Sequence, residues 1–122
     1  MKISVENVTA AFKRYAGETL DGTDASRDQL CEALCGECAG EVEKRLLPGL
    51  EEVPKAAEAL AAAEAFYQLA LLDQAGGPQT VSSPELKIEL GNRAEYAALI
   101  REEKRRACKG LLQEDGFYFG QA

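Results

Sequence analysis

The chain has 122 residues, 46% of them hydrophobic and 29% charged, which is typical of a folded globular protein and excludes a disordered one. This length predicts a single domain over residues 1–122 with one modest core. The formal net charge of -7 opposes nucleic-acid phosphates, and two glutamates interrupt the one basic run, Arg101–Lys109. Specific nucleic-acid binding is therefore not expected.

The chain also lacks histidine, which is the usual general base near neutral pH and the commonest metal ligand. Its absence excludes most hydrolase mechanisms, so we expect no catalytic residues, no cofactor and no enzymatic activity. No apolar run approaches the roughly 20 residues that cross a bilayer, and charge comes too early at the N-terminus for a signal peptide. We expect a cytoplasmic protein without membrane contact.

The first predicted helix begins after Ser4, whose side chain can cap it, and ends at Gly17. Its apolar residues recur at spacings of three and four, as on one face of an amphipathic helix. These residues are Val5, Val8, Phe12 and Tyr15.

The second predicted helix has Asp24 or Ser26 as its cap and ends at the sequence "LPG", residues 47–49. An apolar residue recurs every four positions and is expected to face the core, at Leu30, Leu34, Cys38, Val42 and Leu46. Cys31, Cys35 and Leu47 lie one position along and widen this stripe.

The third predicted helix has Pro54 in its first turn and ends at Gly76 and Gly77. Its many alanines favour helix and indicate close packing against a neighbour. Its broad apolar face comprises Leu60, Ala63, Phe66, Tyr67, Ala70 and Leu71.

Beyond this helix the apolar period changes, because Leu86, Ile88 and Leu90 alternate with charged residues. Such alternation is typical of a strand with one polar side. We therefore predict a short β segment within a loop at about residues 78–91.

The fourth predicted helix begins with a capping box formed by Asn92 and Glu95. Its predicted apolar side comprises Tyr96, Leu99, Ile100, Ala107 and Leu111. The chain ends with an aromatic strand or arm at about residues 116–122, containing Phe117, Tyr118 and Phe119. The expected fold is mainly α, a small four-helix domain with two minor β elements.

Three of the four cysteines fall in the sequence "CEALCGEC" with the spacing C-x3-C-x2-C, which in radical SAM enzymes holds an iron-sulfur cluster. Here the cysteines lie within a helical pattern, where positions 31, 35 and 38 share a face. The preferred interpretation is therefore free thiols packed in the core. The alternative is a metal- or redox-responsive protein whose ligands are Cys31, Cys35, Cys38 and Cys108.

Isolated strands in a small domain leave unpaired edges that can pair with another chain, which points to an interaction protein. The same segments could instead pair with each other or pack on the helices. The order of parts resembles the head-to-tail connector (head completion, or adaptor) proteins of tailed bacteriophages and prophages. The parts that carry the resemblance are "LPGLEEVP", "AAEALAAAEAFYQLALL", "TVSSPELKIEL" and "LLQEDGFYFG".

The resemblance implies a helical bundle with a protruding β loop, which assembles as a ring on the portal protein and binds the next tail component. It places the protein in the bacterial host cytoplasm and then at the head-tail junction of the virion. The implied partner contacts lie in the loop and the C-terminal arm, at Val81, Leu86, Ile88, Leu90, Phe117, Tyr118 and Phe119. The cysteine cluster departs from the family pattern, and a helical interaction module with another partner is a further alternative.

Overall fold

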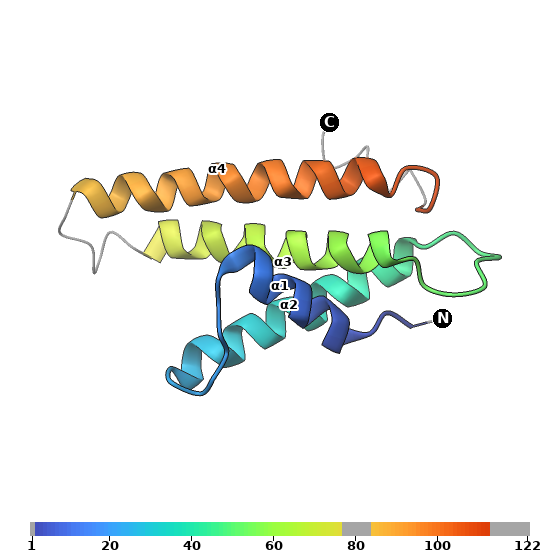
Figure 1. Ribbon diagram of the computed structural model, residues 1–122, viewed down its shortest axis with the longest axis horizontal. Helices are drawn as coiled ribbons and strands as arrows, with labels where there is room; N and C mark the ends of the chain where they lie inside the picture. The colour runs from blue at the N-terminus through green and yellow to red at the C-terminus, as the bar shows by residue number, and fades with distance from the viewer. Residues whose placement is uncertain (1, 77–83, 113–122) are drawn as a thin grey trace.

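The structure is a computed structural model that describes residues 2–76 and 84–112, with the backbone path alone for residues 84–91. Four helices follow one another along the chain: α1 (Val5–Ala16), α2 (Ala25–Arg45), α3 (Lys55–Gly76) and α4 (Pro84–Ala107). Figure 1 shows α3 in the middle, with α4 on one side and α1 and α2 on the other. The mainly helical fold predicted from the sequence is confirmed.

Local capping explains where the first two helices begin and end. The Ser4 hydroxyl accepts a hydrogen bond from the Asn7 backbone N–H, and Gly17, with φ of 73°, donates its N–H to the Lys13 carbonyl. The Asp24 carboxylate accepts from the Arg27 backbone N–H at 3.1 Å and begins α2. The predicted caps Ser4, Gly17 and Asp24 are confirmed.

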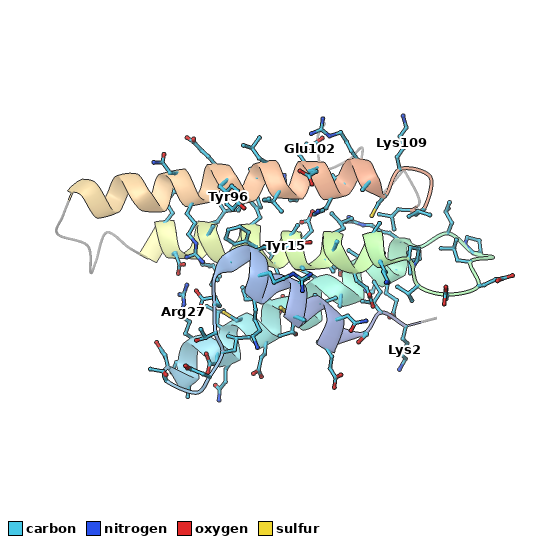
Figure 2. The ribbon with its side chains drawn as sticks, viewed as in Figure 1. Lys2, Tyr15, Arg27, Tyr96, Glu102 and Lys109 are labelled. Atoms are coloured by element: carbon cyan, nitrogen blue, oxygen red, sulfur yellow. The ribbon has the colours of Figure 1, made fainter. Side chains whose placement is uncertain are left out.

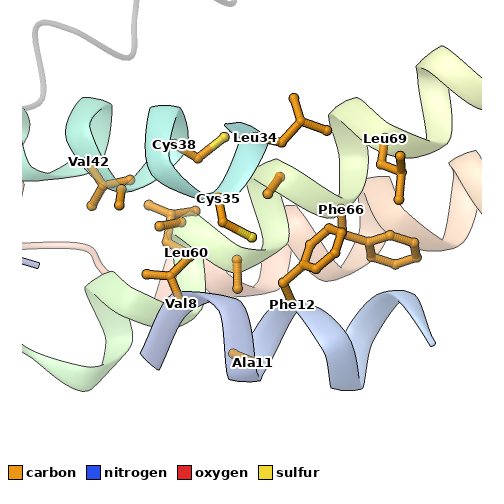
Figure 3. Packing of buried hydrophobic residues seen from close by; sticks show 14 of the residues in the cluster. Val8, Ala11, Phe12, Leu34, Cys35, Cys38, Val42, Leu60, Phe66 and Leu69 are labelled. Atoms are coloured by element: carbon orange, nitrogen blue, oxygen red, sulfur yellow. The ribbon is translucent and has the colours of Figure 1, made fainter. Parts of the chain in front are cut away.

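The core forms where α1, α2 and α3 meet (Figure 3). α3 supplies many small side chains, and its alanines at positions 57, 61, 62, 63 and 65 have no exposed surface. Small side chains let neighbouring helices approach closely, so that larger residues can interdigitate between the alanines. The largest buried side chains are Phe12, Phe66, Leu60, Leu69 and Val8.

The predicted β segment between the third and fourth helices is wrong where the structure describes it. Residues from Pro84 onward are helical, and Leu86, Ile88 and Leu90 lie in the first turns of α4. Proline suits the first turn of a helix because its missing N–H would have no partner there, and the following acidic residue favours the positive end of the helix dipole. Positions 86, 90, 94 and 97 also follow helical spacing, so the three-residue alternation is coincidental.

The predicted capping box is wrong for the same reason, because Asn92 and Glu95 lie inside α4 and both are exposed. Among the described residues the only β pairing is an isolated antiparallel bridge between Leu46 and Leu112. There the Leu47 N–H donates to the Leu111 carbonyl at 3.0 Å. Val81 and the predicted aromatic arm, with Phe117, Tyr118 and Phe119, lie outside the described residues.

The predicted apolar side of the fourth helix is largely wrong. Tyr96 (labelled in Figure 2) is 52% exposed and Leu99 is 69% exposed, whereas the buried residues of α4 between positions 92 and 107 are Ala94 and Ala97. The main neighbour of α4 is α3 alone. The small residues allow the two helices to approach closely, and the large apolar side chains are therefore turned outward.

Candidate functional site

The cysteine cluster lies in the core. Cys31 and Cys35 on α2 have no exposed surface and Cys38 is 3% exposed, and the two labelled thiols in Figure 3 lie among apolar side chains. Cys108, just after α4, is equally buried and donates its thiol to the Ala56 carbonyl at 3.2 Å. All four cysteines are free thiols.

Burial holds these thiols in their neutral form. It raises the pKa of Cys31 and of Cys108 to about 11 and that of Cys38 to about 12. It also raises the pKa of Cys35, although a hydrogen bond with Thr9 opposes the change. Because the thiolate is the nucleophile and the metal ligand, such thiols are poorly suited to either role.

The geometry also separates the proposed metal ligands. Cys38 and Glu64 on α3 line the same hollow, whereas the Cys108 thiol donates to the carbonyl of Ala56, which precedes Glu64 by two turns of α3, about 12 Å along its axis. No three histidine, cysteine or acidic residues in the described part of the chain are grouped so that they could hold a metal ion.

The densest cluster of charged groups joins all four helices. The Arg27 guanidinium on α2 hydrogen-bonds to Asp73 on α3 through two nitrogens at 2.8 Å each, and to Glu18 through Nε at 3.1 Å and Nη2 at 3.0 Å. Arg93 on α4 donates to Asp73 at 3.0 Å and to the Ala16 carbonyl at the end of α1 at 2.9 Å. We call Glu18, Arg27, Asp73 and Arg93 the charge cluster.

The charge cluster balances two cations against two anions. The hydrogen bonds from Arg27 lower the pKa of Asp73 and keep its carboxylate ionised. The side chains are only 17–30% exposed, so water screens these contacts less than it screens surface ion pairs. The arrangement therefore holds the helices together through paired charges.

Sequence reasoning missed this cluster. The four residues are separated by 9, 46 and 20 positions along the chain. No motif connects such distances, and each residue alone resembles ordinary surface charge. A usable signal would have been the position of Arg27 in the first turn of α2, where an arginine opposes the helix dipole unless acidic groups surround it.

A shallow hollow of about 520 Å³ lies between α2 and α3. Gly36 and Gly40 line it from α2, and Glu64 and Gln68 line it from α3. Glu64 also forms ion pairs with Arg105 at 3.6 Å and Arg101 at 3.9 Å on α4. The hollow therefore holds paired charges and no nucleophile in thiolate form.

The first turns of α4 contain three of the predicted partner-binding residues. Positions 86, 88 and 90 share the first turns of α4, and Figure 1 shows these turns extending beyond the end of α3. On α3, Leu71 is 41% exposed and Leu72 is 48% exposed. By sequence, the first turns of α4 are thus rich in apolar residues.

Comparison of the sequence with protein-family models, with curated proteins and with solved structures finds no match in any of the three. Within the described part of the chain, no helix is both long enough and apolar enough to span a bilayer.

Proposed function

We propose that the protein is a non-enzymatic adaptor of virion assembly in a tailed phage or prophage. In this proposal it binds the portal ring and the next tail component at the head-tail junction. The proposal combines the family resemblance of the sequence with the arrangement of the α3–α4 hairpin.

The observation that carries the proposal is the end of α4 that extends past α3 (Figure 1). The first turns of α4 contain Leu86, Ile88 and Leu90. Removing apolar surface from water contributes about 25 cal/mol of favourable free energy per Å². A partner that covers these apolar residues would therefore form a more stable complex.

The helical conformation decides how such a partner would bind. The interior backbone N–H and C=O groups of α4 are already paired within the helix, so they are not available for strand addition. A partner groove that accepts positions 86 and 90, which are one helical turn apart on α4, fits this geometry. The adaptor proposal therefore involves a helix in a groove and not an added strand.

A binding experiment with a matched control tests the proposal. In a triple variant, Leu86→Gln, Ile88→Gln and Leu90→Gln remove the apolar groups with a residue that favours helix. The control is Val5→Gln, which changes a 46%-exposed apolar residue on α1. Each protein is titrated onto an immobilised portal ring encoded by the same genome, and circular dichroism measures its helix content.

The proposal predicts that the triple variant loses most of its portal affinity while the control binds like the native protein, with helix content unchanged in both. Equal portal binding by the triple variant and the native protein would contradict it. Stoichiometric zinc or iron in the purified protein would instead favour the metal-responsive alternative, although the burial of the four thiols gives that alternative no support. Binding to a cellular protein but not to the portal would favour a general interaction module.

A further inference from the structure

The outer face of α4 carries a continuous exposed stripe. Its members are spaced three or four positions apart and so lie within a narrow band along the helix. They are Asn92, Glu95, Leu99, Glu102, Arg106 and, just after the helix, Lys109, and every one is exposed. We call these residues the α4 outer face.

Leu99 stands at the middle of this face and is 69% exposed, more than any other large apolar residue described. Tyr96 flanks it and is 52% exposed, although its ring also contacts Phe66 edge-on at 6.0 Å. The inner side of the same helix buries Ala94 and Ala97. A helix that buries alanine and exposes leucine and tyrosine has an apolar surface that the described fold does not use.

The charges beside Leu99 are complementary to one another. Glu95 lies one turn before it and Arg106 two turns after it, and neither takes part in an ion pair among the described residues. The two are about 16 Å apart along the helix axis, and their midpoint lies about 2 Å from Leu99. An antiparallel copy of the same face would thus bring each Glu95 to the Arg106 of the other copy.

We propose that the α4 outer face binds the same face of a second copy of this chain, as an antiparallel helix pair related by a twofold axis. In this register the axis passes between Ile100 and Arg101. Two Glu95–Arg106 ion pairs flank the two Leu99 side chains, and each Leu99 packs on the aliphatic part of the other copy's Glu102.

The charges also disfavour the neighbouring register. If the axis passed through Leu99 itself, each Glu95 would face Glu103 of the other copy, and like charges would repel. Shifting the axis by about 2 Å replaces this repulsion with the attraction between Glu95 and Arg106. Charge therefore selects one register.

This inference rests on the proposal that the protein acts through its surfaces, and it names one partner. The contact lies along the middle and end of α4, whereas the portal contact proposed above lies at its projecting first turns. The two can therefore fail separately: a chain that stays monomeric can still bind a portal, and a dimer can form without one.

The test exchanges the two charges in the full-length chain, with Glu95→Arg, Arg106→Glu and the double variant. Each single variant places like charges opposite each other in its own dimer, whereas the double variant restores both ion pairs. A mixture of the two single variants also restores both ion pairs, but only between unlike chains. Sedimentation velocity between about 1 µM and about 1 mM covers the range of weak self-association.

We expect the native protein and the double variant to dimerise. Each single variant should dimerise at least tenfold more weakly, and the mixture should form heterodimers. Leu99→Gln should also weaken dimerisation, with helix content unchanged. A native protein that stays monomeric throughout this range would overturn the inference, even if another partner covers the face. Dimers of Glu95→Arg and of Arg106→Glu that are as strong as the native dimer would overturn it too.

Discussion

Arg27 and Asp73 face each other across the contact of α2 with α3, and the two terminal guanidinium nitrogens donate to the two carboxylate oxygens at 2.8 Å each. Such a bidentate pair fixes both the distance and the orientation of its partners. Arg93 approaches the same carboxylate from α4 at 3.0 Å, so one acidic side chain connects three helices. The charge cluster therefore complements the apolar core at the end of the bundle where α2 begins.

The first prediction concerns the stability that Arg27 contributes. Arg27→Ala removes four hydrogen bonds and leaves Glu18 and Asp73 with Arg93 as their remaining cation. We expect the free energy of unfolding to fall by about 1–3 kcal/mol, because hydrogen bonds to charged groups are the strong ones. Urea denaturation at pH 7 measures the change.

A surface ion pair provides the matched control for this experiment. Lys44 and Glu41 lie 3.5 Å apart on α2 with side chains 77% and 61% exposed. We expect Lys44→Ala to change the free energy of unfolding by less than about 0.5 kcal/mol. Equal effects of the two variants would show that the charge cluster contributes no more than ordinary surface charge.

The second prediction concerns the pH dependence of the same cluster. The pKa of Asp73 is lowered from its usual 3.8, so its ionised form stabilises the fold above that pH, and this contribution is lost as the pH falls below it. The stability difference between the native protein and Asp73→Asn should therefore be constant near neutral pH and shrink below pH 3.8. Urea denaturation at a series of pH values tests this, and a difference that persists unchanged at pH 2 would contradict it.

The third prediction concerns the thiols. Because burial raises the pKa of Cys31, Cys38 and Cys108 to about 11 or 12, the folded protein should react slowly with thiol reagents at pH 8 and rapidly in urea. Stability should also decline as the pH rises above 9, because unfolded thiols ionise there more readily than folded ones. Mass spectrometry after alkylation counts the modified cysteines, and fast modification of the folded protein would contradict the burial of the cluster.

The fourth prediction concerns the close contact between α3 and α4. Ala97 has no exposed surface, so Ala97→Leu should overpack this contact and lower the free energy of unfolding by about 1–3 kcal/mol. Ala107→Leu adds the same side chain at an exposed position near the end of α4 and serves as the control. Thermal denaturation distinguishes them, and similar melting temperatures for the two variants would place Ala97 outside a tight contact.

Local signals in the sequence predicted much of the fold. Ser4, Gly17 and Asp24 cap helices through their own side chains or backbone, so neighbouring residues alone reveal the helix boundaries. The cysteines of α2 were predicted as core residues because they share a helical face with Leu34 and Val42, and all are buried. Such features depend on short segments and are readable without the tertiary structure.

The errors in the sequence-based prediction concern α4 and have two physical causes. The alternation of Leu86, Ile88 and Leu90 is too short to distinguish a strand from helical positions, and the proline before it starts a helix. The inward side of α4 is set by the small-residue surface of α3, so Ala97 is buried and Leu99 is exposed. Neither fact follows from the hydrophobicity of α4 alone.

The candidate site divides in the same way. Leu86, Ile88 and Leu90 stand within five positions of one another, so the sequence alone can group them as candidates, whereas the members of the charge cluster meet only after folding. The exposed face around Leu99 likewise becomes visible only when the packing of α4 is known.

The most direct test of the adaptor proposal is mass photometry of this protein mixed with a purified portal ring encoded by the same genome. The proposal predicts that the mass of the ring rises by a discrete amount, equal to many copies of the chain, and that the rise saturates. A portal mass that stays unchanged at every concentration of the protein would contradict the proposal.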